Sequence, residues 1–209
     1  MSQRSTYFHL VLLFITLSVL AWSGIAPKDR FTWVLEVSPV FIGVALALFT
    51  YRRFPLTNLL YTLIAIHCVV LSVGGKYTYA EVPVGYWIQE LFHFSRNHYD
   101  RLGHFLQGFV PAILAREILI RKNVVNGNVW RFLFVVCICL SFSAFYELIE
   151  WWAAVLTGEG ATAFLGTQGD VWDTQWDMFI ALVGAISAQL ILGRVHDKQL
   201  SALARSRGK

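Results

Sequence analysis

Apolar stretches as long as a membrane-spanning helix recur along almost the whole chain, and they leave few folds open to it. A helix needs about 20 apolar residues to cross the roughly 30 Å hydrocarbon core of a bilayer. Only 14% of the 209 residues are charged and 56% are hydrophobic, which is too little charge for the surface of a soluble domain. The sequence therefore predicts an all-α, multi-pass membrane protein with the lipid bilayer as its surroundings.

Six of these stretches are predicted to be transmembrane helices of one polytopic bundle. They lie at residues 8–25, 31–50, 56–73, 99–120, 130–156 and 171–192. The first could be mistaken for a signal peptide, but Trp22 suits a cleavage site poorly, so we interpret it as a retained span. We expect residues 1–195 to form a single six-span transmembrane domain, and residues 196–209 to form a polar cytoplasmic tail that is partly disordered.

The third connection, from Gly74 to Arg96, is the longest interruption and is rich in aromatic residues. Tyrosine and tryptophan favour the headgroup region of a bilayer, where the ring is in apolar surroundings and the polar atom meets water. An interfacial helix is therefore expected from about Gly85 to Phe94. It would anchor the protein or, alternatively, form a lid or a surface at which lipid enters.

Basic residues are distributed unevenly between the two sides of the predicted bundle. The N-terminus, the second and fourth connections and the tail carry 1, 2, 4 and 5 of the 17 lysines and arginines, against 2, 3 and 0 in the other connections. The positive-inside rule then places the N- and C-termini in the cytoplasm. The net charge of +4 reflects this topology and indicates no nucleic-acid partner, and the sequence names no protein partner.

The strongest functional signal is a set of acidic residues close to the predicted spans. The segment from Phe132 to Gly193 has no lysine or arginine, yet it contains Glu147, Glu150, Glu159, Asp170, Asp173 and Asp177. Carboxylates in a bilayer are costly without a partner, a solvated cavity or a proton. The predicted topology brings the acids of the last two spans to the same side of the membrane as Asp100 and His104, so we expect one shared site.

Helical spacing indicates which of these side chains point the same way. Three pairs are three or four residues apart: Asp100 with His104, Glu147 with Glu150, and Asp173 with Asp177. Each pair shares one face of its helix. Clustered carboxylates repel one another, so a bound divalent cation, Arg96 or Arg101, a charged His104 or protonation of the acids must compensate.

A metal site is the preferred interpretation. The expected metal ligands are Asp100, His104, Glu147 and Asp173, with Glu150 or Asp177 as the catalytic base that activates water. Carboxylates with one imidazole suit Zn, Mn or Fe, and a wetter subset of oxygen ligands would suit Mg or Ca. Gln107, Tyr146 and Gln168 are expected to orient the ligands.

Two other polar residues within the predicted spans are assigned structural roles. Glu36 lies near the outer end of the second span, where it can reach the surface or pair with Arg30. His67 is a lone histidine in the third span, which is typical of hydrogen-bonded packing.

Three segments carry the candidate site: NHYDRLGHFLQG at 97–108, YELIEWW at 146–152 and GDVWDTQWD at 169–177. Together they resemble the uncharacterised bacterial inner-membrane family typified by YjdF, over nearly all of residues 7–195. The resemblance implies a multi-pass protein of the bacterial inner (plasma) membrane without an established activity. It implies the same polar motif residues as the spacing does, and it supplies no chemistry.

Our preferred hypothesis is a metal-dependent hydrolase or transferase that acts on a lipid or lipid-linked substrate at the periplasmic face. A proton- or ion-coupled transporter or relay could use the same carboxylates, although the cytoplasmic halves of the last three spans offer few polar groups. A non-catalytic scaffold would need only capped helix ends and salt bridges to Arg96 and Arg101. No nucleotide-binding, Gly-x-Ser-x-Gly or His-Glu-x-x-His motif occurs, so soluble-cofactor chemistry is unsupported.

Overall fold

The computed structural model describes residues 3–157 and 162–207, and within them the regular structure is entirely helical. The helices are α1 (Gln3–Gly24), α2 (Arg30–Thr50), α3 (Asn58–Tyr77), α4 (Pro83–Phe92), α5 (Tyr99–Arg121), α6 (Asn128–Thr157), α7 (Thr162–Leu165) and α8 (Asp173–Arg207). Each predicted span thus corresponds to one long helix. The prediction of an all-α membrane bundle is confirmed.

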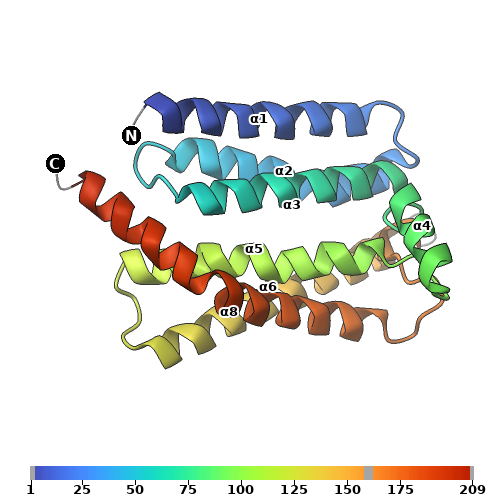
Figure 1. The fold of residues 1–209 in the computed structure, drawn as a ribbon. Helices are drawn as coiled ribbons and strands as arrows, with labels where there is room; N and C mark the ends of the chain where they lie inside the picture. Colours follow the sequence, from blue (N-terminus) through green and yellow to red (C-terminus); the bar gives the residue numbers. More distant parts are fainter. Residues whose placement is uncertain (1–2, 158–161, 208–209) are drawn as a thin grey trace.

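The long helices form two groups that lie side by side (Figure 1). In one group α3 packs against α1 and α2, and in the other α5, α6 and α8 pack against one another; α3 and α5 join the two groups. Both chain ends lie at one end of the bundle, which we call the terminal end, and α4 lies at the other, which we call the α4 end.

Five of the described helices are long and apolar enough to cross a bilayer. They contain the segments Ser5–Gly24, Arg30–Thr50, Asn58–Tyr77, Asn128–Thr157 and Asp173–Arg205. The helix α5 is equally long but bears charged residues at both ends, including the buried Arg116 and Glu117. Its role as a sixth span therefore stays a prediction.

The closest helix pair, α5 with α8, meets through small residues. A Cβ atom at Gly108 would overlap the carbonyl oxygen of Ala181, and one at Gly184 would overlap that of Phe105. Ala185 and Ala188 continue the contact on α8 and are fully buried. Small residues let two helix backbones approach closely in a membrane, which is what fixes α8 against α5 here.

A polar network locks the same two helices near the terminal end. The fully buried Glu117 accepts a 2.9 Å hydrogen bond from the hydroxyl of Thr57 and one of 2.6 Å from Arg121. Its other contact is His196 Nε2 at 3.1 Å, and His196 also lies 3.0 Å from Arg116. Every charged group in this network has a partner, so the network joins α3, α5 and α8.

The C-terminal segment differs from the expectation of a partly disordered tail. The predicted boundary between residues 195 and 196 falls inside α8, which continues as a helix to Arg207. The reason is that His196 is held within the bundle by α5, so the polar sequence that follows starts from an anchored helix.

The helix predicted in the third connection is present as α4, with Trp87, Leu91 and Phe92 exposed, and its interfacial position stays a prediction. The glycine-rich connection before α8 contains the short helix α7, whose Phe164 is buried against Tyr146. Gly158, Glu159 and Gly160 lie outside the described residues.

Candidate metal centre

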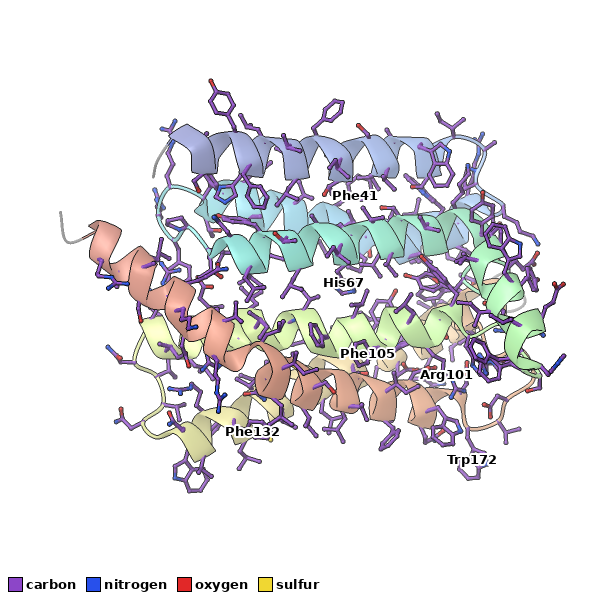
Figure 2. The ribbon with its side chains drawn as sticks, viewed as in Figure 1. Phe41, His67, Arg101, Phe105, Phe132 and Trp172 are labelled. Atoms are coloured by element: carbon purple, nitrogen blue, oxygen red, sulfur yellow. The ribbon has the colours of Figure 1, made fainter. Side chains whose placement is uncertain are left out.

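The acidic residues at the α4 end fall into two layers, and the outer layer is neutralised by arginine. Arg96 Nη1 lies 2.5 Å from Asp173 Oδ1, and Arg101 Nη2 lies 3.0 Å from Asp170 Oδ2. Figure 2 places Arg101 between α5 and α8 at this end of the bundle. The salt bridges to Arg96 and Arg101 that the scaffold alternative predicted are therefore confirmed.

Two connections are clamped together to hold these arginines in place. Arg96 donates to the carbonyl oxygens of Gly166 and Thr167, at 3.2 and 3.1 Å. The Gln168 side chain pairs with both backbone groups of Asn97, at 3.1 and 2.9 Å. Gln168 therefore fixes the start of α5 against the segment before α8, whereas the sequence suggested that it orients metal ligands.

The inner layer surrounds His104, about 8 Å along α5 from its first residue. His104 Nε2 lies 3.5 Å from Asp100 Oδ1 and 3.9 Å from Asp177 Oδ2, while Nδ1 lies 3.8 Å from Glu147 Oε1. Two sets of ligand-type atoms fall within 4.8 Å of one another: those of Asp100, His104 and Asp177, and those of His104, Glu147 and Glu150.

These separations fit metal ligands better than direct hydrogen bonds. A hydrogen bond from nitrogen to oxygen is about 2.7–3.2 Å long. Two atoms that each lie about 2.1 Å from a tetrahedral ion are about 3.4 Å apart. Moreover, His104 Nδ1, Glu147 Oε1 and Asp177 Oδ1 are buried without a hydrogen-bond partner among the described residues. All three side chains are more than nine-tenths buried, so their unpaired atoms are costly unless a ligand satisfies them.

A cavity of about 560 Å³ reaches the inner layer from the middle of the bundle. Asp100, His104 and Glu150 line its polar end, whereas Glu147 and Asp177 lie behind them. The rest of the wall is mostly apolar and comes from α2, α3, α5 and α6. A water molecule or other small molecule in the cavity would therefore meet Glu150 and the two candidate ligands on α5, Asp100 and His104, directly.

Glu36 belongs to this site, which the sequence interpretation missed. Its side chain is buried rather than at the surface, it lines the cavity, and the hydroxyl of Tyr146 donates to it over 3.5 Å. The expected pairing with Arg30 is wrong because Glu36 points into the bundle. A single acid within an apolar span was the available signal, but only the packing of α2 near α5 and α6 reveals its neighbours.

The structure brings together most of the predicted site residues but changes their grouping. Asp100, His104 and Glu147 meet as expected, with Glu150 and Asp177 beside them. Asp173 is instead held by Arg96. Tyr146 contacts Glu36, and Gln107 lines the cavity with its Oε1 unpartnered among the described residues.

Asp170, in the connection before α8, is the acid of the outer layer that lies outside the spans. A hydrogen bond from the backbone N–H of Trp172, together with Arg101, holds the pKa of Asp170 below its ordinary value of 3.8. The carboxylate is thus ionised and part of a stable ion-pair layer. This layer separates the inner cluster from the surface at the α4 end.

The fold and the cluster define a helical membrane protein with buried carboxylates and a histidine at one end of an apolar cavity. Residues 8–198 match the family model described as "Predicted membrane protein (DUF2238)", and the chain belongs to this family. It is similar to the Inner membrane protein YjdF of Escherichia coli (strain K12), with 57% identity over 182 residues that cover 87% of each chain. No solved structure matches it. The family resemblance is confirmed, and neither description carries an activity.

Proposed function

We propose that the protein is a metal-dependent hydrolase or transferase of the bacterial inner membrane, acting on a lipid or lipid-linked substrate. The observation that carries this proposal is the cluster of Asp100, His104 and Asp177 at the polar end of an apolar cavity. A divalent cation between Asp100, His104 Nε2 and Asp177 would offset the negative charge of these carboxylates and leave His104 Nδ1 to face Glu147. The apolar wall suits a substrate with a hydrocarbon part.

The residues have distinct roles in this proposal. Asp100, His104 Nε2 and Asp177 would hold the metal, because their ligand atoms converge and His104 Nε2 faces both carboxylates. Glu147 lies on the Nδ1 side of the same ring, where a carboxylate typically orients a metal-bound histidine. Glu150 faces the cavity and would act as the base that removes a proton from water. The donor set suits Zn, Mn, Fe or Mg.

The competing functions explain less of the site. The ion pairs of a scaffold account for Asp170 and Asp173 but not for the convergence of Asp100, His104 and Asp177. A relay would need polar groups along the whole bundle. On α5 the polar positions Gln107 and Glu117 are ten residues apart, about 15 Å, and the residues between them that line the cavity are apolar.

The positive-inside distribution supports a periplasmic position for the site. The terminal end carries the basic connections and tail, and the candidate centre lies at the opposite, α4 end. The name of the relative as an inner membrane protein supports the same membrane.

Metal analysis of the purified protein tests the proposal. Inductively coupled plasma mass spectrometry should find about one divalent metal per chain, and His104→Gln and Asp177→Asn should each lose it. Glu147→Gln should weaken metal affinity by about 10- to 100-fold, as for other residues that orient a ligand. Asp173→Asn is the matched control: it removes a nearby acid of the outer layer and should keep the metal while lowering stability.

The outcome is interpreted only for variants that elute as folded monodisperse protein. Metal retained in both His104→Gln and Asp177→Asn would overturn the proposal. So would the absence of metal from the parent protein after dialysis against Zn, Mn, Fe and Mg salts in turn.

A further inference from the structure

The cavity has an apolar mouth on the side of the bundle. Leu46 on α2 and Phe142 and Phe145 on α6 line the cavity, yet their side chains are 58%, 61% and 52% exposed. Residues that are both lining and exposed mark an opening. Both helices are membrane-span candidates, so this opening faces hydrocarbon rather than water. A ligand can therefore reach the cavity from the bilayer, between α2 and α6.

The cavity is also long. On α5 it runs from Asp100 at the polar end to Leu119, which is 19 residues or about 28 Å along the helix axis. The part beyond Pro111 is bounded by apolar side chains such as Leu114, Ile118 and Ile138. Its shape and lining suit an extended hydrocarbon chain, since burying apolar surface needs no directional partner.

Two buried polar atoms interrupt this apolar wall at an intermediate depth. His67 Nε2 on α3 and Gln107 Oε1 on α5 have no hydrogen-bond partner among the described residues, and both residues line the cavity. Figure 2 shows His67 between α3 and α5. Gln107 follows His104 by three residues, so it lies on the same face of α5, about 4.5 Å further from the α4 end.

These two side chains are suited to one acceptor oxygen on a ligand. Rotation of the Gln107 amide by 180° exchanges its oxygen and its NH₂ group, so either can face the cavity. A neutral histidine can carry its proton on Nε2. Both residues can thus donate to a carbonyl oxygen, which has two lone pairs. A plain hydrocarbon or a detergent chain would leave both atoms unpaired.

We infer that the cavity binds one acyl chain of a glycerolipid that enters between α2 and α6, with its ester carbonyl held by His67 and Gln107. The ester lies one helical turn from the candidate metal, which places the adjoining polar headgroup at Asp100, His104 and Glu150. This position of the headgroup rests on the proposed function. The binding of the chain and ester does not, because neither needs the metal.

Photo-cross-linking tests the chain site. The probe is diacylglycerol with a diazirine in the middle of one acyl chain, because its uncharged headgroup needs no cation beside Asp100 and Glu150. It is added to protein in vesicles of phosphatidylethanolamine and phosphatidylglycerol. Cross-links in the parent should map to cavity residues such as Leu114 and Ile138. Leu114→Trp narrows the cavity and should reduce them about tenfold, whereas Leu17→Trp, the same change at an exposed position on α1, should leave them unchanged.

Competition tests the ester contact. Unlabelled diacylglycerol should displace the probe more effectively than its dialkyl ether analogue, which lacks the carbonyl. The double variant His67→Leu, Gln107→Leu should lose this preference. Cross-links confined to outward-facing residues, or equal competition by ester and ether lipid in the parent, would overturn the inference. Metal content measured on the same samples separates the two proposals. Cross-linking as expected in a protein that binds no metal would overturn only the proposed function.

Discussion

Arg96 and Arg101 determine which acids at the α4 end remain free to bind a ligand. Both guanidinium groups are largely buried and face Asp170 and Asp173, so these two carboxylates are already compensated. The contact between Asp177 and Arg101 Nε is longer, at 3.9 Å, and Asp177 Oδ1 has no hydrogen-bond partner among the described residues. The two arginines therefore divide a chemically uniform set of acids into an outer layer held in ion pairs with arginine and an inner layer around His104.

The ion-pair layer predicts a specific dependence of stability on pH. Because the folded-state pKa of Asp170 is below its ordinary value of 3.8, its contribution to stability is present above that value and is lost as the pH falls through the folded-state pKa. Asp170→Asn should lower the unfolding temperature at pH 7. The unfolding temperature of this variant should also fall less steeply than that of the parent as the pH is lowered. Thermal unfolding of both proteins in detergent from pH 7 to pH 3 measures this. An acid limb of unchanged slope in the variant would contradict the assignment.

The sequence predicted the members of the site better than their roles. Asp100 with His104 could be paired from a spacing of four residues, because that rule is local to one helix. Asp173 rather than Asp177 pairs with Arg96, which comes from a distant connection, so the sequence carries no local signal for this pairing. The position of Glu36 beside the cavity was missed for the same reason, since the place of a residue in a helix does not tell which neighbours its side chain meets.

At the scale of elements, the contact between α5 and α8 holds Asp100 and His104 on one helix close to Asp177 on the other. The bounds of α2 were predicted closely, because the length of its apolar stretch sets them. The continuation of α8 past residue 192 could not be predicted, because it depends on His196 meeting Glu117 and Arg116 across the bundle. A polar segment after a span has the same kind of sequence whether it packs against the bundle or extends into solvent.

The close approach of α5 and α8 predicts a reversal of the usual effect of a glycine substitution. In an exposed helix interior, glycine to alanine stabilises by about 0.5–1 kcal/mol. Gly108→Ala should instead destabilise by about 1–3 kcal/mol, because its Cβ overlaps the Ala181 carbonyl oxygen and forces the helices apart. Gly193→Ala is the matched control, since its Cβ would meet no atom within 4 Å. Unfolding in mixed micelles with increasing dodecyl sulfate gives both free energies, and equal effects would refute the packing argument.

At the scale of the whole molecule, polarity is arranged along the bundle axis. The α4 end carries the arginine layer and the candidate metal centre, the middle holds an apolar cavity with a lateral mouth, and the terminal end is closed by the Glu117 network. A substrate that is part polar and part hydrocarbon fits such a gradient in one direction only. The orientation of the bundle in the membrane then decides on which side the candidate metal centre lies.

Cysteine accessibility should place the α4 end in the periplasm, because the basic connections and tail at the terminal end favour the cytoplasm. Ser95→Cys lies in the exposed connection between α4 and α5, and Asn126→Cys in the exposed connection between α5 and α6. In spheroplasts, a membrane-impermeant maleimide should label Ser95→Cys at once and Asn126→Cys only after permeabilisation, with the parent chain as the background for Cys68, Cys137 and Cys139. The opposite pattern would invert the bundle and move the candidate metal centre to the cytoplasmic face.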